Sequence, residues 1–240
     1  DGAYKRYYQA KQTNQNKRLN AIFVQKDVSK NWSDTETIDN KAMKELYDIV
    51  WGNVLRKNVT NIQMLKYYNV MQNKFDVVSC QFAIHYMFAN EETLDIFCAN
   101  VNKVMKKDSY FMGTCLDGER VNEFLSTNNK IGKINDNIVW MLEKKYDKYE
   151  KNQTGQTISV YLESINRVYD EYLVDFDLLK TKLAKYDITV LNDTDLKKLG
   201  IKESISNFKS WYSEQDYSLP DVLKEYSFLN SWFIFKKYNE

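Results

Sequence analysis

The segment from residue 75 to residue 88 constrains the fold of this chain most, because it joins an apolar run to a polar and aromatic turn. Residues 75–80 form a short apolar run with β-branched side chains, which predicts a buried parallel strand. The turn at residues 81–86 follows, and it contains His85, the single histidine of the chain. Ligands of open α/β sheets bind outside the carboxyl ends of the strands, so we expect the functional site at this turn.

The first half of the chain alternates between helical and strand patterns. The predicted elements are helices at 1–17, 41–73 and 91–107 and strands at 21–24, 75–80 and 110–114. Alternation of this kind predicts a mostly parallel sheet with right-handed crossover connections. Asp27 would then lie at the carboxyl end of the strand at 21–24.

The pattern changes after residue 116. Strand patterns at 138–142 and 157–162, separated by a charged stretch, predict an antiparallel insertion. A helix at 175–185, a strand at 188–191, a mostly helical segment at 196–212 and an aromatic strand at 231–236 complete the chain. We expect one domain over residues 1–240, with a core at 1–116, the insertion at 117–174, and closing helices and antiparallel strands at 175–240.

Composition excludes several classes of protein. The formal net charge is +1, from 34 basic and 33 acidic residues, which argues against a protein that coats nucleic acid through bulk charge but leaves room for a local basic groove. Cys80, Cys98 and Cys115 lie far apart in apolar context, which predicts reduced core thiols and no metal site. No apolar run has the length of a membrane span or the form of a signal peptide, so we expect a soluble, intracellular protein.

Three motifs resemble one family. Residues 79–86 read Ser-Cys-Gln-Phe-Ala-Ile-His-Tyr, residues 110–114 read Tyr-Phe-Met-Gly-Thr, and residues 171–176 read Glu-Tyr-Leu-Val-Asp-Phe. In order and spacing, from Arg6 through the last strand, the chain resembles the messenger-RNA cap (guanine-N-7) methyltransferases. The likeness is greatest to the version in the multifunctional capping enzymes of large DNA viruses.

The resemblance implies an α/β fold: a class I S-adenosylmethionine-dependent methyltransferase sheet, Rossmann-like, lacking its first strand and carrying an antiparallel cap-binding insertion. It implies transfer of a methyl group from S-adenosylmethionine to N-7 of the 5′ GpppN cap, with S-adenosylhomocysteine as the product and no metal. The implied partner is 5′-capped RNA. The resemblance also implies RNA triphosphatase and guanylyltransferase domains upstream, an activating subunit, and a location in a viral factory, virion or nucleus.

The resemblance also assigns site residues, one position at a time. Since guanine N-7 carries its own lone pair, no catalytic base is expected and the residues act by positioning. For the cofactor, the resemblance implies that Asp27 contacts the adenine and that Gln81 and Tyr86 contact the methionine and sulfonium. For the cap, it implies that His85, Glu171 and Trp232 contact the guanine and that Phe82 is an aromatic wall of the same pocket. Arg6 would lie near the cap phosphates.

The chain departs from the family pattern at several points. Asp108 and Ser109 stand where the family has two glycines, and Trp232 stands where it has a tyrosine. All seven glycines are isolated. The family's first strand, its glycine-rich loop and the acid that ends its second strand would therefore lie upstream of Asp1.

Two other functions are open to this sequence. A non-catalytic cap-binding or stimulatory module would explain the missing glycine turn, although such a module has no need of Asp27 and Gln81. A small-molecule methyltransferase of the same fold would show no selective binding to cap analogues. Individual residues also have structural alternatives, because a lone histidine such as His85 is often structural and Trp232 lies in an aromatic stretch that could simply be core.

Overall fold

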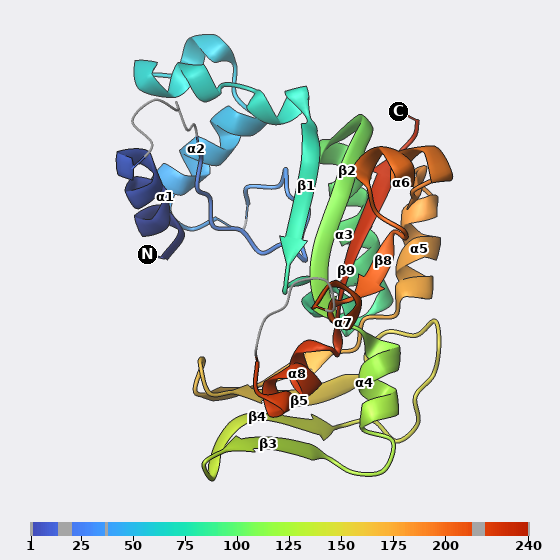
Figure 1. Ribbon diagram of the computed structural model, residues 1–240. Coiled ribbons are helices and arrows are strands. Elements are labelled where there is room, and N and C mark those ends of the chain that lie inside the picture. Colours follow the sequence, from blue (N-terminus) through green and yellow to red (C-terminus); the bar gives the residue numbers. More distant parts are fainter. Residues whose placement is uncertain (1, 14–20, 37, 213–218, 240) are drawn as a thin grey trace. The chain divides into compact units, whose positions relative to one another are not determined.

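The computed structural model describes residues 2–13, 21–36, 38–212 and 219–239 (Figure 1). The chain divides into two compact units, the first made of residues 1–27 and 32–69 and the second of residues 28–31 and 70–240. Within the described residues, no helix is both long enough and apolar enough to cross a membrane.

The first unit is built from helices. Its elements are α1 (Gly2–Thr13), α2 (Lys41–Trp51) and the 3-10 helices η1 (Arg56–Asn58) and η2 (Ile62–Tyr67). Asn40 begins α2 by accepting a hydrogen bond from the Met43 backbone N–H at 3.0 Å. Gly52 ends it in the left-handed conformation, with φ of 70°. The predicted helix over 41–73 therefore ends as an α-helix at residue 51, and only short 3-10 helices follow, the last of them η3 (Val70–Asn73).

Two further predictions concern the first unit. The strand expected at 21–24 is wrong, because residues 21–27 have no regular structure. Phe23 and Val24 are about 40% exposed and pair with no described strand, and a strand forms only where a neighbour accepts its backbone hydrogen bonds. The helix expected at 1–17 is confirmed over 2–13, and its other residues lie outside the described part of the chain.

A five-stranded sheet forms the centre of the second unit (Figure 1). Its strands are β1 (Phe75–Gln81), β2 (Met105–Leu116), β9 (Asn230–Lys237), β7 (Ile188–Val190) and β8 (Ile205–Asn207). β1 is parallel to β2, whereas β9 runs antiparallel to β2, β7 and β8, so the prediction of a mostly parallel sheet is wrong for the described strands. The pairing of Ile188 with Lys237 confirms the predicted closing antiparallel strands.

β1 is the edge of this sheet, so the predicted strand is confirmed but its predicted burial is wrong. Val77 is 50% exposed and Phe75 is 38% exposed. Among the described strands β1 pairs with β2 alone, which leaves its other edge without a neighbour. An apolar run in the sequence therefore does not show on how many sides a strand is covered.

Helices α3 (Glu91–Val104) and α5 (Phe176–Ala184) cover one face of the five-stranded sheet (Figure 1). The helices expected at 91–107 and 175–185 are thus confirmed, apart from the last residues of the first. Phe111 of β2 packs on Phe97 of α3, with ring centroids 6.0 Å apart, and on Phe233 of β9 at 5.2 Å. Residues that alternate with these, such as Met112 and Ile234, face the opposite side of the sheet.

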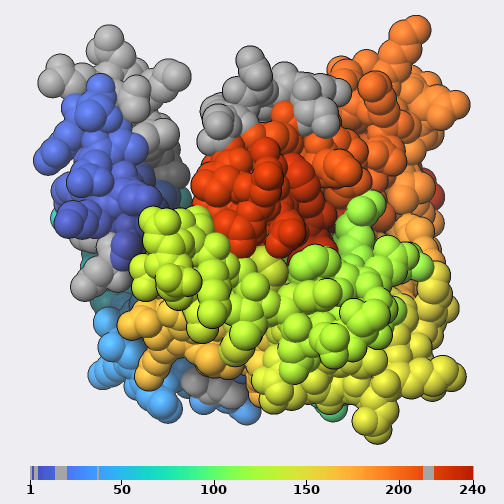
Figure 2. Space-filling view, turned by 60° about the horizontal axis from the view of Figure 1, so that its bottom comes forward, coloured from blue at the N-terminus to red at the C-terminus, as the bar shows by residue number. Residues whose placement is uncertain are grey.

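The insertion forms a second sheet of four antiparallel strands, of which two were expected. They are β3 (Lys130–Ile134), β4 (Asn137–Lys144), β5 (Thr157–Leu162) and β6 (Arg167–Tyr172), in that spatial order. Helices α4 (Gly118–Phe124) and α8 (Asp221–Ser227) pack on this sheet, and Figure 2 shows the C-terminal segment in red lying against the green and yellow insertion. Trp140 of β4 donates from Nε1 to the Val222 carbonyl at 2.6 Å.

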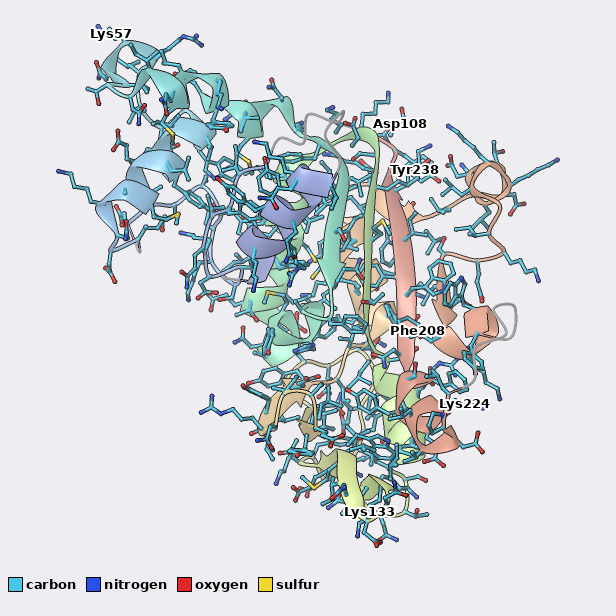
Figure 3. All side chains as sticks on the ribbon, turned by 60° about the vertical axis from the view of Figure 1, so that its left-hand side comes forward. Lys57, Asp108, Lys133, Phe208, Lys224 and Tyr238 are labelled. Atoms are coloured by element: carbon cyan, nitrogen blue, oxygen red, sulfur yellow. The ribbon has the colours of Figure 1, made fainter. Side chains whose placement is uncertain are left out.

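The segment between β7 and β9 contains more than the helix expected at 196–212. Helix α6 (Asp193–Leu199) ends at Gly200, which has φ of 69°, and β8 separates it from α7 (Phe208–Tyr212). This arrangement places Phe208 at the junction between the two sheets (Figure 3). The junction is where the site residues gather.

Candidate functional site

The turn after β1 places the site. Phe82 has φ of 52°, a conformation that non-glycine residues rarely adopt, while its backbone N–H still donates to the Thr114 carbonyl at 2.8 Å. The chain therefore leaves the sheet within one residue and enters the 3-10 helix η4 (Ile84–Ala89), which carries His85 and Tyr86. Unusual backbone conformations of this kind cluster at functional sites.

A cavity of about 650 Å³ opens at the junction of the two sheets, and we call it the polar cavity. Four predicted site residues line it together, namely Phe82, His85 and Tyr86 from the turn and Glu171 from β6. Its remaining walls come from Cys115, Leu116, Leu162, Ile165, Tyr169, Phe208, Tyr226, Ser227 and Asn230. The structure thus brings half of the predicted site residues to one cavity of a size typical for small-ligand sites.

His85 and Glu171 form the buried end of the polar cavity. Burial lowers the pKa of His85 to about 4 and raises the pKa of Glu171 to about 7. His85 Nδ1 lies 3.8 Å from Glu171 Oε2, which is too long for a hydrogen bond. His85 is therefore neutral near pH 7, and the contact is not a salt bridge.

One atom at this end has no partner. His85 Nε2 is the only buried side-chain nitrogen or oxygen without a hydrogen bond within the described part of the chain. Buried polar atoms are almost always hydrogen-bonded, so an unpaired one calls for a specific explanation. A polar ligand in the cavity would supply a partner here.

The outer end of the polar cavity is aromatic. Phe82 is 56% exposed and Tyr86 is 48% exposed. The Phe82 ring meets Phe208 edge-on with centroids 6.3 Å apart, and the Tyr86 ring lies 4.1 Å from that of His85. Burial and the nearby Glu171 raise the pKa of Tyr86. A planar ligand would therefore meet aromatic faces at the entrance and polar groups further in.

Sequence reasoning missed three lining residues from the end of α8 and the start of β9, namely Tyr226, Ser227 and Asn230. Asn230 donates from Nδ2 to the carbonyls of Tyr226 and Ser227, at 3.3 and 3.2 Å, and so fixes the end of α8 beside the cavity. Burial raises the pKa of Tyr226 above its usual value. No spacing in the sequence could have identified these residues, because α8 reaches the site through its packing against the insertion and Asn230 through the pairing of β9 with β2.

A second cavity, of about 510 Å³, lies on the open face of the five-stranded sheet, and we call it the apolar cavity. It contains Gln81 and Trp232. The other lining residues are Met112, Gly113, Thr114, Leu199, Ile201, Phe208, Trp211, Phe233 and Ile234. Phe208 lines both cavities, whereas Trp232 lines the apolar cavity and the four other predicted residues line the polar cavity.

Gln81 is held by its neighbours at the carboxyl end of β1. Its Nε2 donates to Ser79 Oγ at 2.9 Å, and its Oε1 accepts from Thr114 Oγ1 at 2.8 Å. Its side chain is exposed, so one amide N–H and one carbonyl lone pair stay available to a ligand. Gly113 beside it has no room for a Cβ, which would lie 2.1 Å from the Cys80 carbonyl oxygen.

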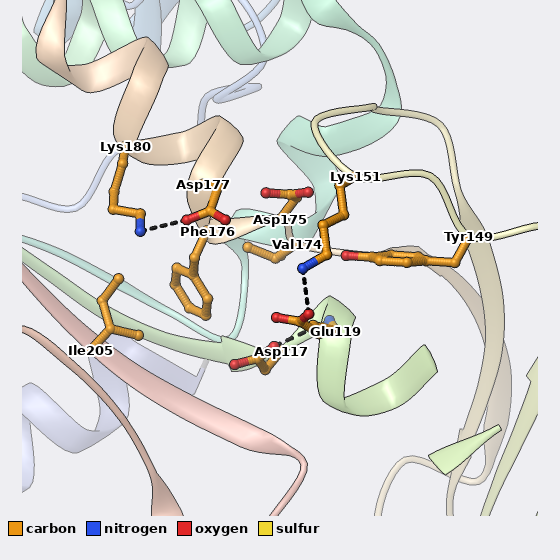
Figure 4. A pocket seen from close by; sticks show the side chains of 10 residues that line it. All are labelled: Asp117, Glu119, Tyr149, Lys151, Val174, Asp175, Phe176, Asp177, Lys180 and Ile205. Carbon is orange, nitrogen blue, oxygen red and sulfur yellow. Dashed lines mark hydrogen bonds and ion pairs between the residues drawn. The ribbon is translucent and has the colours of Figure 1, made fainter. Parts of the chain in front are cut away.

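A smaller crevice near the start of α5 is acidic, but its charges are already partnered (Figure 4). Glu119 pairs with Lys151 at 2.6 Å, and Asp177 pairs with Lys180 at 2.5 Å. Asp117 accepts from Ser231 Oγ at 3.0 Å. The Asp117–Ser231 bond joins the insertion to the core, and the two ion pairs satisfy the other charges locally, so we assign the crevice a structural role.

Arg6 and Asp27 belong to the first unit. Arg6 is exposed on α1, and Asp27 is exposed after the irregular segment at 21–26. The roles predicted for these two residues stay predictions.

Residues 1–214 match the mRNA (guanine-N(7))-methyltransferase domain family, and the chain belongs to that family. With the sheet described above, this confirms the predicted class I methyltransferase fold. The chain is 28% identical over 172 residues to a "Probable mRNA-capping enzyme" of Acanthamoeba polyphaga mimivirus, a match that covers 68% of this chain and 14% of the relative.

Cellular relatives match as well. An mRNA cap guanine-N(7) methyltransferase of Caenorhabditis briggsae is 28% identical over 123 residues, which cover 50% of this chain and 32% of the relative. Another, from Saccharomyces cerevisiae, is 28% identical over 139 residues, which cover 53% and 31%. The chain thus spans about a third or less of the length of these relatives.

Proposed function

We propose that the chain transfers a methyl group from S-adenosylmethionine to N-7 of the guanosine that caps RNA. One observation carries the proposal: the polar cavity ends in a largely buried Glu171 beside the buried and unpartnered Nε2 of His85. Membership of the methyltransferase family agrees with it. A polar, planar ligand would supply the hydrogen-bond partner that His85 Nε2 lacks and would fit between the aromatic walls of the cavity.

Guanine fits the two ends of the polar cavity. Its ring N–H and exocyclic amine can both donate to the Glu171 carboxylate, which only accepts when ionised. Adenine offers no such pair of donors on one edge, so Glu171 would discriminate between the two purines. Phe82 supplies an aromatic face, and a stacked base gains about 1–3 kcal/mol from such a contact.

The chemistry asks for positioning and not for proton removal. Guanine N-7 is a nucleophile through its own lone pair, so the site needs no general base. His85, neutral near pH 7, would hold the base by a hydrogen bond. Burial of His85 and Glu171 keeps water from the inner end of the cavity, which strengthens both contacts.

The residues present fit the cofactor that this family implies. S-adenosylmethionine supplies the electrophilic methyl group when bound. Gln81 retains a free donor and acceptor for the methionine end, and the exposed Tyr86 face suits the positive sulfonium. Asp27 would read the adenine, and Arg6 the cap phosphates. Trp232, which lines the apolar cavity, is the proposed guanine contact that geometry supports least.

We also propose capped RNA as the partner and a longer capping enzyme as the setting. The chain aligns with only 14% of the mimivirus relative, whose name is that of a capping enzyme. Triphosphatase and guanylyltransferase domains and an activating subunit would accompany the domain there. The protein would then work where capping occurs, in a viral factory or virion, or in the nucleus of a cell.

The test is methyl transfer from labelled S-adenosylmethionine to GpppA-capped RNA by the full-length gene product, with Glu171→Ala beside it. We expect the substitution to reduce transfer by about 100-fold or more, since hydrogen bonds to a charged group contribute about 1.5–3 kcal/mol each. Glu123→Ala, which removes an exposed carboxylate from α4, is the matched control. Tight cap binding without transfer would identify a binding module, and absence of selective cap binding would point to a small-molecule substrate.

A further inference from the structure

Three side chains of β6 form a row that enters the polar cavity. Alternate residues of a strand share a face, so Arg167, Tyr169 and Glu171 point to the same side of the insertion sheet. In the sheet, Arg167 pairs with Leu162 of β5, Tyr169 pairs with Val160, and Glu171 pairs with Ile158. Tyr169 and Glu171 both line the polar cavity.

Exposure increases along this row. The Glu171 side chain is 18% exposed, Tyr169 is 39% exposed, and Arg167 is exposed at the outer end. Successive members of the row are roughly 7 Å apart, since each strand residue advances about 3.4 Å. The row therefore leads from the inner end of the cavity to solvent.

The outer members of the row have free binding capacity. No ion pair or hydrogen bond involves the Arg167 side chain among the residues that the structure describes. Ile165, at the turn between β5 and β6, is 51% exposed and lines the cavity beside Tyr169. Asp170, the acid between Tyr169 and Glu171, faces the opposite side and accepts from Ser159 Oγ at 2.5 Å.

We propose that the RNA chain of the bound substrate extends along this row, from the guanine site to solvent. This inference rests on the proposed function. The base of the first transcribed nucleotide packs on Tyr169 and Ile165, and Arg167 binds the phosphate that follows it. Aromatic faces stack on any base, and a free guanidinium suits a phosphate. The preferred substrate is then a capped RNA and not a guanosine nucleotide alone.

The ligands that test this path are GTP, the dinucleotide GpppA and a GpppA-capped RNA, whose dissociation constants are measured by titration at several salt concentrations. Tyr169→Ala and Arg167→Ala remove the outer row. Tyr161→Ala removes a tyrosine that pairs with Val168 and so faces the other side of the same sheet. Lys133→Ala removes an exposed cation from β3, at the far edge of the insertion (Figure 3).

We expect Tyr169→Ala to weaken binding of GpppA and of capped RNA by about tenfold while leaving GTP unchanged. Arg167→Ala should weaken capped RNA alone and lower the slope of its log affinity against log salt by about 0.7, the value for one phosphate on a single strand. The two control variants should change neither quantity.

Two outcomes would overturn the path. If capped RNA binds no more tightly than GTP, or if both row variants leave capped RNA unaffected, the row has no role and the proposed function still stands. If the wild-type chain binds none of the three guanine ligands, the proposed function fails and this inference fails with it.

Discussion

The polar and apolar cavities share Phe208 but differ in what surrounds them. The polar cavity holds a buried carboxyl group with a raised pKa and an imidazole nitrogen without a partner. The apolar cavity is lined mainly by aliphatic and aromatic side chains, and its one amide, Gln81, already bonds to Ser79 and Thr114. The two cavities are similar in size, but only the polar cavity contains a buried polar atom, among the described residues, that lacks a hydrogen-bond partner.

This difference separates a binding site from a packing surface. Burial of Glu171 and His85 costs free energy, and His85 Nε2 has no hydrogen-bond partner among the described residues, which is why we propose that a ligand binds here. Burial of Phe233 and partial burial of Trp232 stabilise the fold without any ligand. A polar group that is buried without a partner is thus a better guide to function than the volume or hydrophobicity of a cavity.

The first prediction, which has the largest expected effect, measures how much the burial of the Glu171 carboxylate lowers the stability of the fold. Its pKa of about 7 lies above the ordinary value of 4.5, so ionisation is unfavourable in the folded state. The resulting loss of stability is absent below about pH 4.5 and complete above about pH 7. Glu171→Gln should therefore stabilise the chain at pH 8 by up to about 3 kcal/mol, and much less at pH 5.

Denaturant unfolding of both forms at the two pH values measures this. Glu123→Gln, on the exposed surface of α4, should change neither value. Equal stability of wild type and Glu171→Gln at pH 8 would mean that the protein itself compensates the buried carboxylate. The contrast between the cavities would then disappear.

The second prediction separates the ring of Phe82 from its backbone. Phe82→Ala and Phe82→Gly should both weaken binding of GpppA by about tenfold, since each removes one stacking face. The glycine variant should be more stable than the alanine variant by about 1 kcal/mol, because φ of 52° is strained for any residue with a Cβ. Calorimetric titration and thermal unfolding give the two quantities.

Two results would contradict the proposed stacking of guanine on Phe82 or the strain in its backbone. If both variants bind GpppA as wild type does, Phe82 is only part of the wall shared with Phe208. If the two variants are equally stable, the left-handed turn is not strained.

The sequence predicted the centre of this site better than its surroundings, for physical reasons. The strand at 75–81 and the turn after it are local, and Asn90 and Asp175 begin their helices by bonds to residues three positions on. Local features of this kind can be read from spacing. Gly52 and Gly200 are also local signals, because a glycine in the left-handed conformation ends α2 and α6, although the predicted helices at 41–73 and 196–212 run past them.

Other features depend on contacts that spacing does not reveal. β6 has no apolar alternation, because its inward face carries Arg167, Tyr169 and Glu171, so no strand was expected there. Glu171 was reached only through the family resemblance. The placement of Tyr226 depends on α8 packing against the insertion, many residues away in the chain.

The third prediction concerns the pH dependence of binding. Guanine donates to the ionised form of Glu171, so GpppA affinity should increase with pH and level off above about pH 7, the pKa of this carboxyl group. Below that value it should fall by up to about tenfold per pH unit, as one proton competes with the ligand. His85, with a pKa of about 4, should add no second step above pH 5.

Titrations of wild type and Glu171→Gln across this range check the assignment. The variant should bind weakly and without pH dependence. A wild-type profile that is flat between pH 5 and pH 8 would show that the carboxyl group is already ionised or is not in contact with the base.

The smallest expected effect decides whether the two cavities are one site. Trp232 lies opposite Thr114 on the sheet and lines only the apolar cavity, so Trp232→Leu should change GpppA affinity by less than about twofold. It should still lower stability, because part of a buried aromatic surface is lost. Trp211→Leu, which alters the same cavity from α7, is the matched control. A tenfold loss of GpppA affinity in Trp232→Leu alone would place the guanine across Phe208, in contact with both cavities. That result would support the guanine contact that the family resemblance assigns to Trp232, and it would remove the distinction between binding site and packing surface.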